Sequence, residues 1–159
     1  QGGTCACVGG QTETLCSDGL DNDCDGNRDC ADPDCLAAIP ELTCGEQVSG
    51  DTEGGGTRFT RYGVGFGCTG QAVHSGPEAI YRFVAPADGE YTVQTVTELD
   101  IVVIGADASG GCDPTQCEGY SAAGSSSNVS FTAVAGETYY ILVDGVEQRF
   151  GAYVLFMSC

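Results

Sequence analysis

Beyond residue 41, hydrophobic and polar residues alternate along short stretches that are separated by glycine-rich turns. In residues 78–84, for example, Ala79, Tyr81 and Phe83 would share one face of an extended strand, because successive side chains of a strand point to opposite faces. No window shows the stripe of an amphipathic helix. The pattern predicts about eight strands, namely residues 46–52, 57–62, 78–84, 91–96, 99–104, 129–133, 138–143 and 151–157.

The stretch 99–104 is apolar throughout except for Asp100, which is typical of a central strand that is buried on both faces. A carboxylate in such a strand needs partners. We expect a structural hydrogen-bonding role for Asp100, with an arginine or a second calcium ion as alternative partners. Residues 83–91 and 131–139 share a Phe-x-Ala-x-Ala start, a Gly-Glu pair and a final tyrosine, which predicts two equivalent hairpins.

About eight strands with glycine-rich turns favour an all-β fold, a jelly-roll-type β-sandwich. We expect residues 41–159 to form this sandwich domain. Residues 1–40 show no such alternation and lack the apolar content to order themselves. They are expected to be a small segment that is braced by disulfides.

Residues 16–35 contain seven aspartates and four cysteines against a single arginine. So many carboxylates cannot all stay ionised at close quarters unless a positive charge lies among them. A hard cation that prefers oxygen ligands would supply it, and Ca²⁺ is the expected cofactor. Residues 1–40 are therefore expected to be a calcium-binding segment rich in cysteine and aspartate.

The spacing of these residues matches the loop of an EF-hand, which takes ligands at positions 1, 3, 5, 7, 9 and 12 and has glycine at position 6. With position 1 at residue 21, Gly26 takes position 6. An aspartate then stands where EF-hands carry a bidentate glutamate. Amphipathic helices do not flank the loop, and the cysteines inside it suggest disulfide bracing instead. The predicted ligands are Asp21, Asp23, Asp25, Asn27 (through its backbone carbonyl), Asp29 and Asp32.

Two alternatives are a solvated acidic linker and a zinc site. The glycine in register and the cysteines argue against a plain linker. The cysteines of this segment form no C-x-x-C pair, and His74 is the only histidine, which disfavours zinc. His74 lies in a loop-like context and is expected to be an ordinary surface residue. Catalysis by a histidine-centred triad is therefore not expected, and we expect a protein that is not an enzyme.

These features resemble two known families. Residues 14–35, with the core D-N-D-C-D-G, resemble an Asp/Cys-rich metal-binding motif of secreted bacterial surface proteins. Residues 44–157, with the blocks A-D-G-E-Y-T-V and E-T-Y-Y-I-L-V-D-G, resemble the bacterial pre-peptidase C-terminal (PPC) domain. The second resemblance implies a β-sandwich appended to secreted peptidases and surface proteins. It also implies a fold similar to the collagen-binding modules of bacterial collagenases, some of which bind calcium.

The net charge of −18 and the pI near 4.1 exclude nucleic acid and anionic membrane surfaces as charge-driven partners. The longest apolar run, residues 152–157, is too short to insert across a membrane. Eleven cysteines indicate disulfides and an oxidising compartment. The chain begins at Gln1 without a basic-then-apolar leader, as expected of a mature secreted chain. We therefore expect an extracellular protein of the cell surface.

An odd number of cysteines leaves at least one unpaired or bridged to another chain. We expect a local Cys112–Cys117 bridge around a turn sequence, and a pair among Cys44, Cys68 and Cys159. Cys5 and Cys7 are only one residue apart, would strain if bridged to each other, and are candidates for intermolecular bridges. The disulfide candidates are Cys16, Cys24, Cys30, Cys35, Cys44, Cys68, Cys112, Cys117 and Cys159.

The sequence thus predicts a secreted, non-enzymatic, calcium-binding structural or adhesive protein, in the form of a subunit of an extracellular fibre or surface assembly. The expected partners are further copies of itself or other extracellular surface components, with a protein or polysaccharide ligand as a further option. An alternative function is an accessory protein- or polysaccharide-binding module that is associated with a secreted hydrolase.

Overall fold

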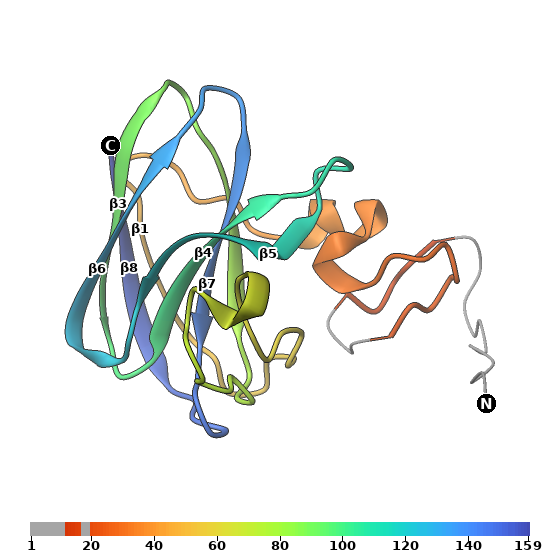
Figure 1. Ribbon diagram of the computed structural model, residues 1–159, viewed down its shortest axis with the longest axis horizontal. Coiled ribbons are helices and arrows are strands. Elements are labelled where there is room, and N and C mark those ends of the chain that lie inside the picture. Colours follow the sequence, from red (N-terminus) through yellow and green to blue (C-terminus); the bar gives the residue numbers. More distant parts are fainter. Residues whose placement is uncertain (1–11, 17–19) are drawn as a thin grey trace.

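The computed structural model describes residues 12–16 and 20–159, and its strands form two four-stranded antiparallel sheets (Figure 1). One sheet has the strand order β1-β8-β3-β6 and the other β2-β7-β4-β5. The all-β sandwich predicted from the sequence is confirmed. The strands are β1 (Gln47–Asp51), β2 (Ala79–Val84), β3 (Gly89–Thr97), β4 (Asp100–Ala106), β5 (Cys112–Ser121), β6 (Gly124–Ala133), β7 (Thr138–Asp144) and β8 (Ala152–Ser158).

The pairing of strands is that of a jelly roll. The first strand pairs with the last, β2 pairs with β7, β3 with β6 and β4 with β5. A long two-stranded ribbon of this kind, folded over on itself, gives an eight-stranded double sheet. Both sheets contribute side chains to one shared core.

The two sequence repeats are crossovers between the sheets, not hairpins within one sheet. The first connects β2 to β3 and the second connects β6 to β7, and in each pair the strands belong to different sheets. Tyr91 and Tyr139 fold back onto these turns. The Tyr91 hydroxyl donates to the carbonyl of Ala87 at 2.8 Å, and the Tyr139 hydroxyl accepts from the N–H of Val134 at 3.1 Å. In both repeats, the tyrosine hydroxyl therefore holds the turn that connects one sheet to the other.

Strand β4 is buried on both faces, as its apolar sequence predicts. Ile101 and Val103 point into the core between the sheets. Val102 and Ile104 point to the opposite face and pack in a second apolar layer on the outside of the β2-β7-β4-β5 sheet. That outer layer is covered by the N-terminal segment and by the stretch after β1.

The expected strand over residues 57–62 does not form. Its backbone N–H groups find a carboxylate instead of a neighbouring strand: Glu78 accepts hydrogen bonds from the N–H of Arg58 at 3.1 Å and of Phe59 at 3.4 Å. The apolar residues of this stretch still point at the sheet, and Tyr62 is fully buried. Phe59 and Tyr62 both pack in the outer apolar layer, although a strand would point them to opposite faces, so the predicted alternation is not realised and the backbone pairs with a side chain.

Strand β5 was not predicted, because its sequence CDPTQCEGYS is polar and contains Pro114. It is an edge strand, and an edge tolerates both properties since one side of it needs no hydrogen-bonded neighbour. Its pairing with β4 is interrupted by two register shifts, which further weakens the alternation.

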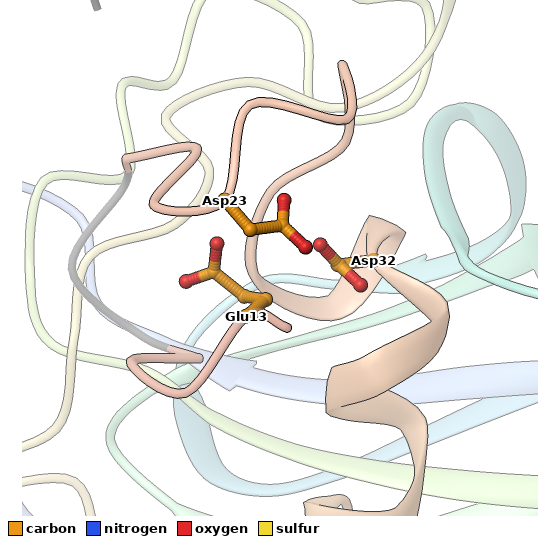
Figure 2. Close-up of side chains that lie close together, drawn as sticks. All are labelled: Glu13, Asp23 and Asp32. Atoms are coloured by element: carbon orange, nitrogen blue, oxygen red, sulfur yellow. The ribbon is translucent and has the colours of Figure 1, made fainter. Parts of the chain in front are cut away.

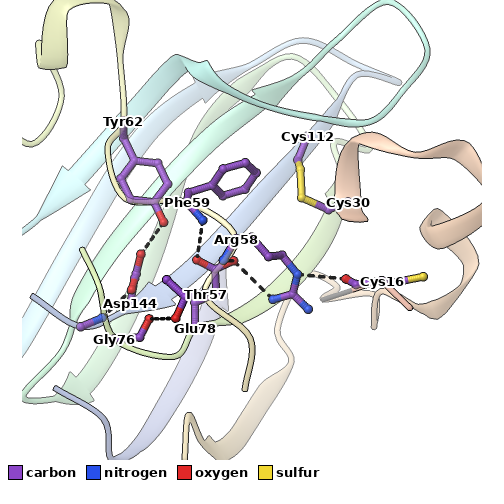
Figure 3. Close-up of polar contacts among 11 residues, drawn as sticks. Cys16, Cys30, Thr57, Arg58, Phe59, Tyr62, Gly76, Glu78, Cys112 and Asp144 are labelled. Carbon is purple, nitrogen blue, oxygen red and sulfur yellow. Dashed lines mark hydrogen bonds and ion pairs between the residues drawn. A yellow bond between two sulfur atoms is a disulfide. The ribbon is translucent and has the colours of Figure 1, made fainter. Parts of the chain in front are cut away.

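The N-terminal segment contains two short 3₁₀ helices, η1 (Asp29–Ala31) and η2 (Pro33–Ala38), and a third, η3 (Val64–Phe66), lies in the loop before β2. Figure 3 shows how the segment is anchored to the sandwich. Cys30 is bridged to Cys112 at the start of β5, and Arg58 Nε donates to the carbonyl of Cys16 at 3.2 Å. Leu36 and Ile39 pack against the outer apolar layer.

The disulfides correct one prediction and confirm another. The local Cys112–Cys117 bridge is wrong, because strand β5 holds these cysteines apart and each pairs with a distant partner: Cys112 with Cys30, and Cys117 with Cys68. The expected pair within the larger domain is Cys44–Cys159, which ties the start of the domain to its end. Cys16 is bridged to Cys35, and Cys24 is also disulfide-bonded. Cys5 and Cys7 lie outside the described residues.

Candidate metal-binding site

Two groups of carboxylates converge in the N-terminal segment, and they share Asp23. In the first group Asp23 lies with Glu13 and Asp32, and in the second it lies with Asp21 and Asp25. Within each group, one oxygen from every residue lies within 4.8 Å of the others. Figure 2 shows the first group, with the carboxyl group of Asp32 directed toward Asp23 and that of Glu13 beside them.

The two groups differ in burial. Glu13 is only 2% exposed and Asp32 is 0% exposed, whereas Asp25 lies open to solvent. Carboxylates that are exposed to water keep their hydration, while buried ones must find partners inside the protein. The first group therefore carries the stronger demand for a compensating charge.

Asp32 has one satisfied and one unsatisfied oxygen. It caps η2, and its Oδ1 accepts a hydrogen bond from the N–H of Asp34 at 2.8 Å. Its Oδ2 is buried and has no hydrogen-bond partner in the described part of the chain. Burial raises the pKa of Asp32 despite the Asp34 N–H, and the negative charges of Asp25, Asp23 and Asp34 add to the rise.

Glu13 is held in place from several sides. Its Oε2 accepts from the backbone N–H of Asn22 at 2.7 Å, and its Oε1 accepts from the Asn22 side-chain amide at 2.9 Å. Its own N–H donates to Asp34 Oδ2 at 3.3 Å. The sequence reasoning missed Glu13 because it precedes the twelve-residue register. Only the Cys16–Cys35 bridge, which brings the two stretches together, reveals it.

The loop between these residues is shaped by its own side chains. Gly26 takes a φ of 102°, a left-handed conformation that favours glycine, as the loop register predicts for position 6. Asp21 accepts from the N–H of Cys24 at 2.6 Å through Oδ1 and from the N–H of Gly26 at 3.1 Å through Oδ2. Asp25 accepts from the backbone and the side-chain amide of Asn27, at 2.7 Å and 3.2 Å.

Four of the six predicted ligands thus come together in the two groups, namely Asp21, Asp23, Asp25 and Asp32. Asn27 lies beside the second group through its bonds to Asp25. Asp29 is buried within η1 with a φ of 50°. Among the residues that the structure describes, its carboxylate belongs to neither group.

His74 is not the surface residue that its loop-like context predicts. It is fully buried, and its Nε2 lies 2.8 Å from Asp100 Oδ2. Asp100 also accepts from the Tyr120 hydroxyl and from the N–H of Ala123, both at 2.7 Å. Burial acts to raise the pKa of Asp100, but these hydrogen bonds outweigh it and lower the pKa. The structural hydrogen-bonding role expected for Asp100 is confirmed.

Two further buried carboxyl groups belong to Asp144 and Glu78. The Tyr62 hydroxyl donates to Asp144 Oδ2 (Figure 3), and burial raises the pKa of Asp144 to about 6. Burial and the neighbouring Asp144 charge raise the pKa of Glu78 to about 8, against the pull of Arg58. Shifted carboxyl groups of this kind often mark catalytic sites, but Asp144 and Glu78 are almost completely shielded from solvent. Their positions fit a structural role in joining the outer layer to the sheet.

A shallow, mainly apolar hollow of about 400 Å³ lies on the outer face of the β1-β8-β3-β6 sheet. It is lined by residues of β3 and β8 that include Val96 and Val154, and Val96 is largely exposed. This sheet faces away from the outer layer that carries the N-terminal segment. The hollow and the acidic groups are therefore separate features.

Comparison with known families supports the second of the two resemblances. Residues 77–145, which contain β2 to β7, match the model of the bacterial pre-peptidase C-terminal domain. This family comprises non-catalytic domains that are associated with secreted proteases. For the matched residues, an extracellular non-catalytic module is therefore supported. The match does not extend to the N-terminal segment, whose resemblance to an Asp/Cys-rich metal-binding motif stays a prediction.

Among solved structures, the chain is similar to the pre-peptidase C-terminal domain of a collagenase from Bacillus anthracis. The two chains are 16% identical, with a TM-score of 0.49, and the similarity covers 76% of this chain and 94% of the other. No curated protein matches the chain significantly. The described residues contain no helix that is both long and apolar enough to cross a bilayer.

Proposed function

We propose that the protein is a secreted, non-enzymatic, calcium-binding structural or adhesive component of the cell exterior. The observation that carries this proposal is the buried oxygen of Asp32, which lacks a hydrogen-bond partner within the described residues and faces two further carboxylates. Buried negative charges that face one another are unfavourable unless a cation neutralises them. Calcium accepts six to eight oxygen ligands in flexible geometry, so carboxylates, carbonyls and water would complete its shell.

Calcium would act on the architecture of the N-terminal segment. Leu36 and Ile39 of the segment pack against the sandwich, whereas Leu15 and Leu20 are exposed, and the turns of the segment are held by acidic side chains. A cation at one hundred times its dissociation constant adds about 2.7 kcal/mol to the folded state. That amount decides whether a segment of this size stays ordered against the sandwich.

Location and lack of catalysis have separate support. Four disulfides join described residues, which is typical of an oxidising compartment. The single histidine is fully buried and cannot reach a substrate. The match to a family of non-catalytic domains agrees with both points.

Thermal unfolding of the intact, oxidised chain tests the calcium proposal. Added Ca²⁺ should raise the melting temperature and EDTA should reverse the rise. Mg²⁺ at the same concentration should have a smaller effect, because it demands stricter octahedral geometry and gives up its water reluctantly. Equal melting curves in Ca²⁺ and in EDTA would contradict the proposal.

The assembly part of the proposal is a subunit of an extracellular fibre or surface assembly, formed through self-association or with other surface components. The odd number of cysteines supports it. Size-exclusion chromatography with and without EDTA, and electrophoresis with and without reductant, should show calcium-dependent or disulfide-linked oligomers. A monomer that responds to neither treatment would refute the assembly and leave the calcium proposal untouched.

The alternative function is an accessory module that binds a protein or a polysaccharide beside a secreted hydrolase. The family match over residues 77–145 and the apolar hollow at Val96 favour it. Pull-down on collagen and on insoluble polysaccharides would test it, with a Val96→Asp variant as the control for the hollow. Retention of the native chain, together with loss of retention by the variant, would favour the module over the structural subunit.

A further inference from the structure

The most informative residue for the cation site lies outside the predicted loop. Glu13 precedes the loop by eight residues, yet its carboxylate is buried and converges with those of Asp23 and Asp32. A glutamate that is 2% exposed is unusual unless it is paired. Its described hydrogen bonds come from the neutral Asn22, which leaves its charge without compensation in that contact.

The second observation is the open oxygen of Asp32. This side chain is fully buried, and its Oδ2 has no partner among the described residues. The negative charges of Asp25, Asp23 and Asp34 act on it as well. A buried acceptor of this kind costs free energy, and a cation bound among the three carboxylates would satisfy it.

The second group has no counterpart of this open oxygen among the described residues. Both oxygens of Asp21 accept backbone N–H groups, and both oxygens of Asp25 accept from Asn27, as both oxygens of Glu13 accept from Asn22 in the first group. Asp25 is also exposed to water. The demand for a cation is therefore greater at the first group than along the linear loop.

The Cys16–Cys35 disulfide explains how this group is built. Glu13 and Asp32 each lie three residues before one of the two bridged cysteines. The bridge joins the two stretches at a Cα–Cα distance of 5.5 Å, and the Glu13 N–H donates across the junction to Asp34. The chain thus places a distant glutamate beside the last aspartate of the loop.

We infer that Glu13 is a cation ligand and that the site is formed by Glu13, Asp23 and Asp32, with a hard divalent cation of the calcium type as its occupant. This inference rests on the proposed calcium binding and specifies its ligands. Glu13 replaces the bidentate glutamate that ends an EF-hand loop, and it arrives from upstream through the disulfide. Asp21 and Asp25 shape the loop and contribute less to affinity.

Calorimetric titration of the intact, oxidised chain with Ca²⁺ alone tests the assignment. Glu13→Gln and Asp32→Asn should each weaken binding at least tenfold, because each removes a buried charged ligand. The matched control Asp21→Asn removes a charge of the same loop and should weaken binding less than threefold. Circular dichroism and the elution volume identify any variant that fails to fold.

A structural role for Glu13 is separated from a ligand role by the sign of the stability change. In EDTA, Glu13→Gln relieves repulsion among the three carboxylates and should raise the melting temperature. In saturating Ca²⁺ it should lower the melting temperature relative to the native chain. A residue that only packs would shift the melting temperature in the same direction under both conditions.

The outcomes are distinguishable. If Asp32→Asn weakens binding but Glu13→Gln does not, calcium binding stands and the inference about Glu13 fails. If Asp21→Asn has the largest effect, the cation occupies the linear loop and the inference also fails. If the native chain takes up no Ca²⁺, the proposed function fails with it. A Cys16→Ala, Cys35→Ala double variant should also lose affinity at least tenfold, and native affinity in it would contradict the role of the disulfide.

Discussion

At the scale of single residues, the buried carboxylates of Asp100 and Asp32 differ in how fully the protein satisfies them with hydrogen bonds. Asp100 receives three hydrogen bonds, from His74, Tyr120 and Ala123. Asp32 keeps one buried oxygen without a partner in the described part of the molecule. The first arrangement satisfies its carboxylate within the fold, and a bound cation would satisfy the second.

Asp100→Ala tests the first arrangement. It leaves His74 and the Tyr120 hydroxyl without their acceptor, and buried unpaired donors are costly, so the free energy of unfolding should fall by about 2–4 kcal/mol. Asp113→Ala is the control, since Asp113 is partly exposed and accepts hydrogen bonds from its near neighbours Thr115 and Gln116; it should cost less than about 1 kcal/mol. Urea unfolding of both variants measures the difference, and equal losses would contradict the role of the network.

The raised pKa of Glu78 makes the free energy of unfolding depend on pH. Its pKa in the folded state is raised to about 8, so the folded chain holds a proton that the unfolded chain releases near its ordinary pKa. The contribution of Glu78 to the free energy of unfolding is therefore fully present below its pKa in the unfolded chain, and it is lost as the pH rises toward 8. Asp144 acts in the same direction but at lower pH, since its pKa is about 6.

Between pH 6 and 8 in EDTA, the native chain should lose about 1–3 kcal/mol of unfolding free energy from this group. Glu78→Gln cannot ionise and should show a flatter dependence over the same interval. Denaturant unfolding at several pH values measures the slopes. A variant slope as steep as the native one would show that another group is responsible.

Local spacing is enough to predict the turn at Gly26, which takes the left-handed conformation expected at position 6 of the loop register. Asp23 and Asp25 follow from the same register, and their role as ligands stays a prediction. Glu13 could not be found in this way, because its position depends on which cysteine Cys16 joins. His74 was misjudged because a loop-like sequence does not show that residues 57–62 and Asp100 enclose it.

At the scale of elements, the docking of η1 against the sheet is the critical contact. Gly111 stands just before β5, and a Cβ there would lie 2.7 Å from the carbonyl oxygen of Ala31. Only glycine allows this approach, which the adjacent Cys30–Cys112 bridge then holds. The N-terminal segment is thus attached by close backbone packing as well as by a covalent bond.

Gly111→Ala should push η1 away from β5 and lower the unfolding free energy by about 1–3 kcal/mol. Trypsin should then cut after the exposed Arg28 faster than in the native chain, as followed by mass spectrometry after reduction. Gly151→Ala is the matched control, since a Cβ at that position meets nothing within 4 Å. Equal cleavage rates in the two variants would argue against the close contact.

Elements that bury one face in the core were predicted well from the alternation of side chains. Strands β2, β3 and β8 follow it closely, and β4 follows its apolar run. Strand β5 could not be predicted because an edge strand with proline and few apolar residues has no such signature. The stretch 57–62 does not form the predicted strand because its N–H groups at Arg58 and Phe59 donate to the Glu78 carboxylate, a contact that sequence spacing does not reveal.

At the scale of the whole molecule, the acidic N-terminal segment is attached to the sandwich by the Cys30–Cys112 disulfide, by the hydrogen bond from Arg58 to the Cys16 carbonyl and by the apolar packing of Leu36 and Ile39. The jelly-roll class followed from the number of strands and their turns, whereas the strand order and the disulfide map required the three-dimensional structure. Under this account the cation converts the N-terminal segment from a repelling cluster of charges into an ordered part of the surface. Partners outside the cell would then meet a shape that depends on calcium.

The most direct test is a crystal structure of the intact chain grown in excess Ca²⁺. The account predicts an ion within about 2.3–2.6 Å of oxygens from Glu13, Asp23 and Asp32. A structure that shows these three carboxylates turned toward water, with no ion between them at saturating Ca²⁺, would contradict it.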